Sequence, residues 1–415
     1  MKILYATRLF SGLENSCTTG VWSPSGVPTI YKIIEEIDKN YTPRFLFTVK
    51  DSGSGYCSIW KDSNDKEIVI SGLKHSVHVI SGINFFPKWL GRKVRIFLRD
   101  IRQSLFIIIE IIKFKPDLIY CDHANVIIGG LLARIQNRIP VIFRVMGVDD
   151  FMRKCLTPKN LIQGIYKWSY KSSFAIVICT QDGSGVELWL KKGLKRGVTY
   201  EVLLNGVDVV NLCAVKDKNL FRIPDNKVVI LFIGKLEKYK GCYEFVESIL
   251  LMLEKKHQNI HAIMVGTGGE EICLRNTVKK EHATKYFTFI DRLKHEQIFE
   301  AHSICDIYVS LNHFGNLSNA NLEAIQSNDC MIIASPQYKL GIDVITEKIL
   351  GDSVIKVPIN NSNELADRLI ELIYSEEKRN LMSQYIMKRK KDFLYSWDER
   401  INYEIRLFKN ILKDK

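Results

Sequence analysis

The amino-acid sequence predicts an α/β protein made of two doubly wound, Rossmann-like domains in tandem. Its 415 residues are too many for one ordinary hydrophobic core, so two domains are expected. Short, continuous apolar runs alternate with helical patterns, as they do in buried parallel sheets with crossover helices. This alternation stops near residue 210 and then starts again, which indicates a second domain of the same kind.

Each half contains five strand-like runs followed by turn residues. In the first half these are KILYAT, FLFTV, DLIYCD, VIFRVM and FAIVICT; in the second they are KVVILFIG, HAIMVGTG, YFTFID, DIYVSL and CMIIAS. The polar stretch 214–227 lacks periodicity and is the predicted linker. We expect one domain at 1–210, a second at 211–390, and a C-terminal helix at 391–415, which is part of an amphipathic helical stretch predicted over 387–415.

Composition restricts the class of partner and the compartment. The net charge of +13 favours phosphorylated ligands or anionic lipid, and the absence of basic runs interleaved with aromatic residues argues against nucleic acid. The ten scattered cysteines show no metal-ligand spacing and fit a reducing cytoplasm. The apolar start reads as a strand rather than a signal peptide, and the longest apolar run is too short to span a bilayer. We therefore expect a cytoplasmic protein.

The loops that follow the strands of the second half contain the candidate ligand-binding residues. In IGKLEKYKG, Lys235 and Lys240 follow Gly234 and precede a helix, an arrangement that suits a diphosphate. Gly266 follows the next strand in VGTGG. Such loops gather at the carboxyl ends of parallel strands, where ligands bind. Each motif also has a simpler explanation. The two lysines could be solvated loop residues, and VGTGG could be a tight turn.

Glu323 is the one acid between an Asn-rich loop and the helix start ANLEAI, where Asn319 or Asn321 is the expected N-cap. Two interpretations of Glu323 compete. It complements the dipole of the helix, or it binds a ligand that the loop and helix end also hold.

The ordered set NGVD, G-K-L-x-x-x-K-G, VGxGxxE, LEA and IIAS resembles the nucleotide-sugar-dependent glycosyltransferases of family 4. The resemblance covers most of the chain and is strongest over 200–335. It implies the GT-B fold, with an interdomain cleft and a final helix, 391–415, that crosses back onto the N-terminal domain. It also implies sugar transfer, with retention, from a nucleoside-diphosphate sugar to a hydroxyl of a lipid-linked glycan, as in lipopolysaccharide or capsule synthesis.

The resemblance also implies roles for individual residues. Lys235 and Lys240 would neutralise the diphosphate, and Glu323 would accept hydrogen bonds from the ribose hydroxyls. Further donor contacts are expected from Gly26, Gly234, Gly266, Arg292 beside the base, and the amides of Asn321 and Leu322. Asn205 and Asp208 match the NGVD turn, where a structural role is expected. Since the sequence has no D-x-D triplet, cationic side chains would replace a metal, and no cofactor is expected.

Three positions depart from the family pattern, and one of them, Asn328 where the family helix usually ends in Gly, is a mild change. Gly315 stands where the family usually has a second Glu, so Asn316, Ser318 or Asn319 would supply neutral hydrogen-bonding groups instead. Met146 stands where a His is common. His123, at a strand end, is the candidate acceptor-side group, or else a surface loop residue.

A basic amphipathic helix is predicted within 85–114. Arg92, Arg95, Arg99 and Arg102 recur on one face, and apolar residues from Leu90 to Leu105 occupy the other. We expect the apolar side in the core. The arginines, with Phe86 and Trp89, would stay exposed, so that 86–106 contacts an anionic membrane surface from the cytoplasmic side. An ordinary domain helix is the alternative.

Two further classes of protein remain open. A non-catalytic GT-B scaffold that recruits another transferase would explain Gly315 and Met146. A nucleotide-sugar epimerase would use the same donor site without an acceptor.

Overall fold

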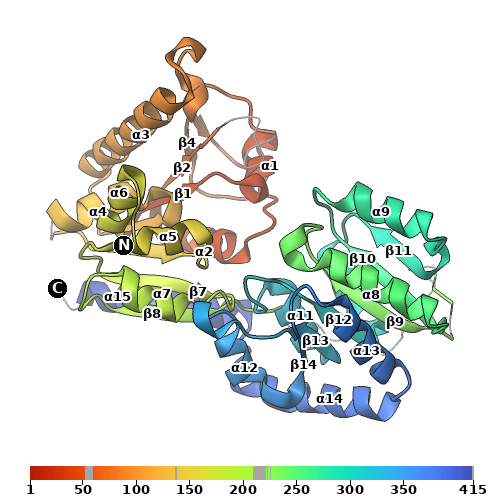
Figure 1. Cartoon of the computed structure of the whole chain (residues 1–415). Helices are drawn as coiled ribbons and strands as arrows, with labels where there is room; N and C mark the ends of the chain where they lie inside the picture. Colours follow the sequence, from red (N-terminus) through yellow and green to blue (C-terminus); the bar gives the residue numbers. More distant parts are fainter. Residues whose placement is uncertain (52–58, 136–137, 209–220, 222, 225, 414–415) are drawn as a thin grey trace. The chain divides into compact units, whose positions relative to one another are not determined.

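The computed structural model describes the chain apart from residues 52–58, 136–137, 209–220, 222, 225 and 414–415, so most of the predicted linker lies outside the described residues. The chain divides into two compact units. Unit 1 contains Met1–Thr180, Trp189–Leu203 and Asp398–Lys415, and unit 2 contains Gln181–Leu188 and Leu204–Trp397. Each has a sheet covered by helices (Figure 1).

The first sheet has the strand order β3-β4-β2-β1-β5-β6-β7-β8, in which the short β3 is antiparallel to β4. Its strands are β1 Lys2–Arg8, β2 Thr42–Thr48, β3 Lys66–Ile68, β4 Val77–Ile80, β5 Leu118–Asp122, β6 Val141–Val145, β7 Ile176–Gln181 and β8 Tyr200–Leu204. The accompanying helices are α1 Ser11–Thr19, α2 Pro28–Asn40, α3 Arg92–Phe114, α4 Val126–Ile135, α5 Asp150–Leu156, α6 Leu161–Tyr170 and α7 Val186–Gly193.

The second sheet is parallel, with the order β11-β10-β9-β12-β13-β14. Its strands are β9 Val228–Ile233, β10 Ile260–Val265, β11 Phe287–Ile290, β12 Ile307–Ser310, β13 Met331–Ala334 and β14 Ile355–Val357. Its helices are α8 Cys242–Glu254, α9 Glu271–Lys280, α10 His295–Ile304, α11 Asn319–Ser327, α12 Val344–Leu350, α13 Ser362–Ile373 and α14 Glu376–Arg389. The predicted pair of doubly wound α/β folds is confirmed, and every predicted strand is present; β3, β4, β8 and β14 were not predicted.

The C-terminal segment does not form the single helix predicted from residue 387. Helix α14 ends at Arg389, and α15 spans Trp397–Lys413. Between the two helices, the carbonyl of Tyr395 accepts a hydrogen bond from the amide of Val207. This bond fixes the non-helical segment that separates them. Along α15 the apolar side chains Ile401, Ile405 and Phe408 are buried.

Helix α3 has the opposite orientation to the predicted one. Its apolar side is exposed: Phe97 is 64% exposed and Leu105 is 55% exposed. Arg99, by contrast, is only 7% exposed. Trp89, before the helix, is exposed as predicted.

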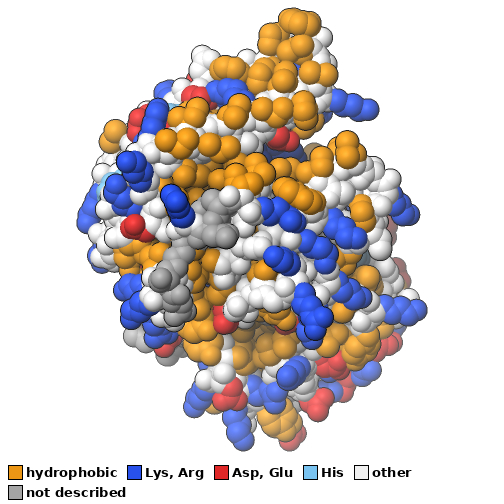
Figure 2. Space-filling view, turned by 90° about the vertical axis from the view of Figure 1, so that its left-hand side faces the viewer, with side chains coloured by type: hydrophobic (Ala, Val, Ile, Leu, Met, Phe, Trp, Pro, Cys, Tyr) orange, Lys and Arg blue, Asp and Glu red, His pale blue; other side chains and the backbone are white. Residues whose placement is uncertain are grey.

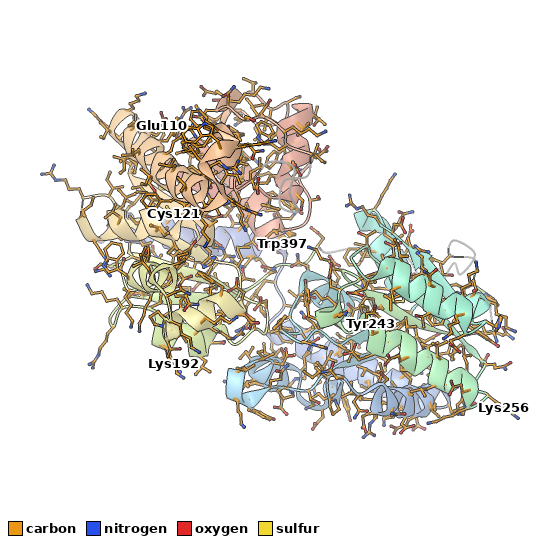
Figure 3. The ribbon with its side chains drawn as sticks, turned by 45° about the horizontal axis from the view of Figure 1, so that its top comes forward. Glu110, Cys121, Lys192, Tyr243, Lys256 and Trp397 are labelled. Carbon is orange, nitrogen blue, oxygen red and sulfur yellow. The ribbon has the colours of Figure 1, made fainter. Side chains whose placement is uncertain are left out.

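Polar contacts explain why α3 turns this way. The amide of Gln103 donates to the carbonyl of Val49 at 2.8 Å and to that of Ser81 at 3.0 Å, beyond the ends of β2 and β4. Glu110, labelled in Figure 3, accepts from the guanidinium of Arg44 on β2 at 2.7 Å. Because buried carbonyls and charges need partners, the polar side of α3 faces the domain. No helix within the described residues is both long and apolar enough to cross a membrane.

Candidate active site

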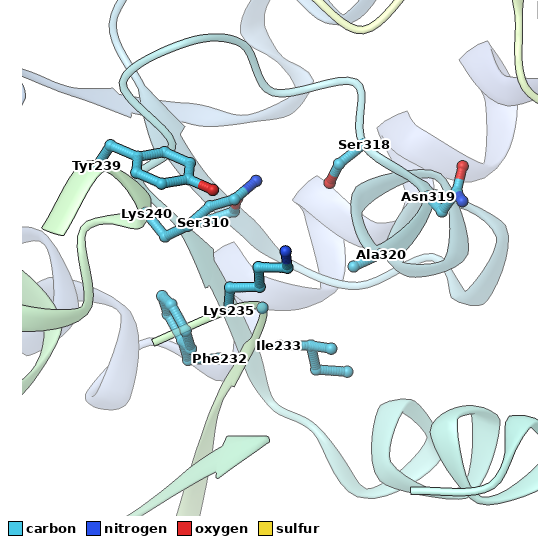
Figure 4. A pocket seen from close by; sticks show the side chains of 10 residues that line it. Phe232, Ile233, Lys235, Tyr239, Lys240, Ser310, Ser318, Asn319 and Ala320 are labelled. Carbon is cyan, nitrogen blue, oxygen red and sulfur yellow. The ribbon is translucent and has the colours of Figure 1, made fainter. Parts of the chain in front are cut away.

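The candidate site lies where the strand order of the second sheet reverses. Strand β9 has β10 on one side and β12 on the other, so the loops that follow β9 and β12 diverge, as at the ligand-binding switch point of doubly wound sheets. A pocket of about 290 Å³ opens there (Figure 4). It is lined by Phe232, Ile233, Gly234, Lys235, Tyr239, Lys240, Ser310, Ser318, Asn319 and Ala320.

Both predicted lysines reach this pocket. Lys235 is exposed, whereas Lys240 is half-buried and its ammonium lies 5.5 Å from the centroid of the Tyr239 ring. Burial lowers the pKa of Lys240; the carboxylate of Asp182 opposes this shift, and the charge of Lys235 adds to it. Two like charges therefore face one pocket, and an anion bound there would relieve their repulsion.

The predicted glycines of these loops permit close backbone packing. Gly266 has a φ of +141°, and a Cβ at this position would lie 1.9 Å from the carbonyl oxygen of Gly234. Side chains are therefore excluded where the loops after β9 and β10 meet. Gly234 lines the pocket, and Gly266 supports it.

Helix α11 contributes its N-terminus to the pocket, although not with the predicted cap. Ser318 is the N-cap residue, so the expectation of Asn319 or Asn321 is wrong. Ser318, Asn319 and Ala320 line the pocket, and first-turn amides have no partner within a helix. The amide of Leu322 already donates to the carbonyl of Ser318 at 2.9 Å, so it is not available to a phosphate.

Two predicted donor-binding asparagines hold the loop instead of lining the pocket. Asn316 is fully buried and donates to the carboxylate of Asp343 through its backbone N at 2.6 Å and through Nδ2 at 2.8 Å. Asn321 donates from Nδ2 to the carbonyl of Asn316 at 3.0 Å. In this conformation both act as positioning residues.

Glu323 lies in the second turn of α11 and is half-buried. Because the helix-dipole effect is confined to the first turn, this position weakens the dipole interpretation. Burial, and then the charge of Glu323, raise the pKa of Tyr308, so the carboxylate lies near that phenol. Glu323 is not among the residues that line the pocket, and its contact with ribose stays a prediction.

Backbone packing explains why Gly315 replaces the family Glu. Its φ is +134°, and a Cβ there would lie 2.4 Å from the carbonyl oxygen of Asp182. Two acids that sequence reasoning missed stand close by. Asp343 is almost fully buried; burial raises its pKa to about 7, and the charge of Asp182 contributes. The turn sequence QDGSG after β7 could have indicated Asp182, but nothing near Asp343 marked it.

The NGVD turn contacts this site through Asn205, whose Nδ2 donates to Oδ1 of Asn319 at 2.6 Å. That contact fits the structural role expected of the turn. Asp208 is half-buried, and Arg292 is exposed in the loop after β11.

The remaining predicted residues belong to unit 1. Gly26 is exposed, with a φ of +87°. His123 follows β5; its Nε2 lies 2.6 Å from the hydroxyl of Tyr170, and burial lowers its pKa. Its ring stacks on that of Tyr170, so it is not a free surface loop residue. Within the described residues no group of three or more His, Cys, Asp or Glu could hold a metal ion, and metal independence stays a prediction.

Comparison with known families identifies the class. A family described as glycosyl transferases group 1 matches residues 216–389, and one described as glycosyl transferase 4-like matches residues 51–181. With two Rossmann-like domains, the chain is a glycosyltransferase with the GT-B fold. It belongs to glycosyltransferase family 4, as the motifs predicted.

Individual relatives are distant. An uncharacterized glycosyltransferase of Methanocaldococcus jannaschii is 19% identical over 299 residues, or 70% of this chain and 73% of that protein. Among solved structures, sucrose-phosphate synthase from Thermosynechococcus elongatus has a TM-score of 0.71 at 13% identity, covering 99% of this chain and 100% of that one. Anabaena HepE, in complex with UDP and glucose, has a TM-score of 0.63 at 14% identity, covering 99% of both chains. At these identities the structural likeness shows the fold.

Proposed function

We propose that the protein transfers a sugar from a nucleoside-diphosphate sugar to a hydroxyl of a glycan. The observation that carries this proposal is the switch-point pocket, where Lys235 and Lys240 face the N-terminus of α11. When the bond between the anomeric carbon and the diphosphate breaks, negative charge develops on the leaving nucleotide. Ammonium groups and helix amides fixed around that charge stabilise the transition state. The UDP bound to HepE supports a nucleotide-sugar donor.

We assign the neighbouring residues to donor positioning. Asn205 fixes Asn319, and Asp343 fixes Asn316, so the end of the loop that leads into α11 is held. Glu323 is the proposed partner of the ribose hydroxyls. Retention at the anomeric carbon and metal independence are proposals that rest on the family resemblance.

We further propose that the acceptor is a lipid-linked glycan of cell-surface polysaccharide synthesis, and that the protein docks peripherally on the inner face of the plasma membrane. The docking face is the outward side of α3. Exposed apolar side chains recur along it at helical spacing: Val94, Phe97, Ile101, Leu105, Ile109 and Ile112. The view in Figure 2 shows a broad area of hydrophobic side chains with lysine and arginine beside it.

Charge on α3 favours an anionic membrane as the occupant of this face. Arg92, Lys93 and Lys113 are exposed at its two ends. Both acids of the helix are paired with arginines: Asp100 with Arg99, and Glu110 with Arg44. An apolar stripe flanked by cations suits the interface of an anionic bilayer.

Calorimetric titration with UDP, GDP, ADP and CMP tests the donor site. We expect one nucleotide to bind selectively, and the affinity to fall roughly tenfold or more in Lys240→Ala. Glu323→Gln should weaken binding of the same nucleotide. Lys238→Ala is the matched control, because Lys238 is an exposed lysine of the same loop outside the pocket. Failure of all four nucleotides to bind would contradict the proposal.

Enzymatic activity separates the remaining candidates. Gly315 and Met146, at positions where the family has ionisable residues, favour a non-catalytic scaffold. Such a scaffold would neither hydrolyse nor transfer the sugar of the selected nucleotide. An epimerase would change the sugar with no acceptor present, whereas the proposed transferase should release free nucleotide only slowly without one.

Co-sedimentation with phosphatidylcholine vesicles containing phosphatidylglycerol tests the membrane proposal. We expect the double variant Phe97→Ser, Leu105→Ser to stay in solution at vesicle concentrations that sediment the wild type. The control is Ile272→Ser, which changes an exposed apolar residue on α9 of the other unit. Equal sedimentation of all three proteins would exclude α3 as the docking face.

A further inference from the structure

The first sheet has its own switch point, and a crevice lies there too. Strand β1 has β2 on one side and β5 on the other, so the loops after β1 and β5 diverge. The crevice between them has a volume of about 30 Å³ and is lined in part by α3, α4 and α6. Its polar lining comes from Arg8, Arg99, Asp100, Gln103, Ser104, Asn125 and Tyr166.

Arg8, the last residue of β1, points a guanidinium with spare hydrogen-bonding capacity into this crevice. Its Nη2 makes one long bond, 3.4 Å, to the carbonyl of Ala124. Its Nη1 is buried and has no hydrogen-bond partner among the described residues. A buried, charged donor without an acceptor is costly, so such a group is expected to meet a ligand.

The nearby carboxylates are occupied by other partners. Asp122 accepts from the hydroxyl of Thr7 and the backbone amides of Arg8 and Asn125. Asp100 accepts two bonds from the guanidinium of Arg99, at 2.8 and 2.6 Å. Among the described residues, the hydrogen bonds of these two acids go to groups other than the guanidinium of Arg8.

Positive charge therefore accumulates at the crevice. Burial lowers the pKa of Arg8, and the charge of Arg99 lowers it further, ahead of the opposing effect of Asp122. Lys50, beyond the end of β2, is also affected: burial lowers its pKa, and so do the charges of Arg8 and Arg99. One half-buried guanidinium, Arg8, and one buried guanidinium, Arg99, therefore face the crevice, and the carboxylate of Asp100 is already paired with Arg99.

We propose that the Arg8 crevice binds a phosphate group of the acceptor substrate. This inference rests on the proposed function and specifies its acceptor: a glycan carrier with a phosphate or diphosphate ester. The planar guanidinium of Arg8 matches phosphate oxygens, and Ser104 and Tyr166 offer hydroxyl donors beside it. At about 30 Å³, against about 290 Å³ for the donor pocket, the crevice suits the oxygens of a phosphate group and not a sugar ring.

Calorimetric titration with inorganic pyrophosphate tests the crevice. The donor pocket would also bind this anion, so the titration uses Lys240→Ala as the background protein. We expect one remaining site, weakened roughly tenfold or more when Arg8→Gln is added. The control Arg196→Gln removes an exposed arginine of the same unit and should leave affinity unchanged.

A second variant separates loss of binding from loss of folding. Ser104→Asp places a carboxylate beside Arg8, and so should abolish pyrophosphate binding while raising the melting temperature. Arg8→Gln should melt no lower than the background protein, because it removes a repulsion with Arg99. Unchanged affinity in both variants, or no pyrophosphate site in the Lys240→Ala background, would overturn the proposal whatever the donor site does.

The source of the phosphate is decided by two parallel assays on wild type and Arg8→Gln. One uses glucose 1-phosphate in solution, and the other uses phosphatidylcholine vesicles containing polyprenyl phosphate. Binding that depends on Arg8 in the first assay supports a soluble sugar phosphate, and in the second a lipid-borne phosphate. If Arg8 matters in neither, the crevice is not an acceptor phosphate site.

Discussion

Helices α3 and α15 have similar amphipathic sequences but opposite orientations in unit 1. Along α15, Ile405 and Phe408 are buried, and the Phe408 ring lies 5.8 Å from that of Tyr120 on β5. Along α3, Phe97 and Leu105 are exposed, and the charged side faces inward. The sequence predicted inward apolar sides for both.

The difference shows that periodicity identifies two faces of a helix without choosing between them. Helix α15 buries charge as well, and its carboxylate has partners inside the unit: Glu404 accepts from Arg400 at 2.8 Å and from the hydroxyl of Tyr120 at 3.2 Å. Helix α3 meets carbonyls beyond the ends of β2 and β4, which require donors such as Gln103. Where a surface presents unpaired polar groups, the polar face of a helix binds it.

The largest expected effect comes from removing the buried carboxylate of α15. Glu404→Gln leaves the buried guanidiniums of Arg144 and Arg400 without their carboxylate. We expect the free energy of unfolding to fall by about 3–5 kcal/mol, measured by urea denaturation. Asp398→Asn, an exposed acid on the same helix, is the control and should change it by less than about 0.5 kcal/mol.

A matched pair of phenylalanine deletions compares the two helices directly. Phe408→Ala on α15 should cost about 3–4 kcal/mol, because it opens a cavity against Tyr120. Phe97→Ala on α3 should cost less than about 0.5 kcal/mol, since its ring is exposed. Equal losses in the two variants would mean that α3 buries its apolar side in solution.

The inward face of α3 should tolerate loss of a charge better than that of α15 does. Glu110→Gln removes one partner of Arg44, but that guanidinium keeps a second at 2.7 Å, Glu67. We expect a loss of about 1–2 kcal/mol in the same denaturation assay. A loss as large as that of Glu404→Gln would show that Glu67 does not compensate.

At acidic pH, the difference in free energy of unfolding between wild type and Glu404→Gln should become smaller. Burial raises the pKa of Glu404, but Arg144 and Arg400 lower it more, so it lies below the usual value of 4.5 in the folded protein. The stability that this carboxylate contributes is present above pH 4.5 and is lost as the pH falls through the folded-state pKa. Unfolding measured from pH 7 to pH 3 should therefore show the stability gap between the two proteins closing. A gap that widened in acid would contradict the assignment.

The fold was predictable because its signals are local. Each buried strand reads as an apolar run, and each is followed by turn residues. The donor loops were recognisable for the same reason, since Gly234, Lys235 and Lys240 are close together in the chain. The sequence analysis missed Asp343, which lies in a different loop from its partner Asn316. It also assigned Asn316 to the donor, although the side chain of Asn316 donates a hydrogen bond to Asp343.

The sequence alone determined the two sheets, the loops that hold the lysines and the family to which the chain belongs, because these depend on residues a few positions apart. Tertiary structure decided which face of α3 is exposed, why glycine stands at 315, and that Arg8 lies beside Arg99. Each of these depends on groups brought together from distant parts of the chain. Burial and charge act through space, and spacing along the sequence does not record them.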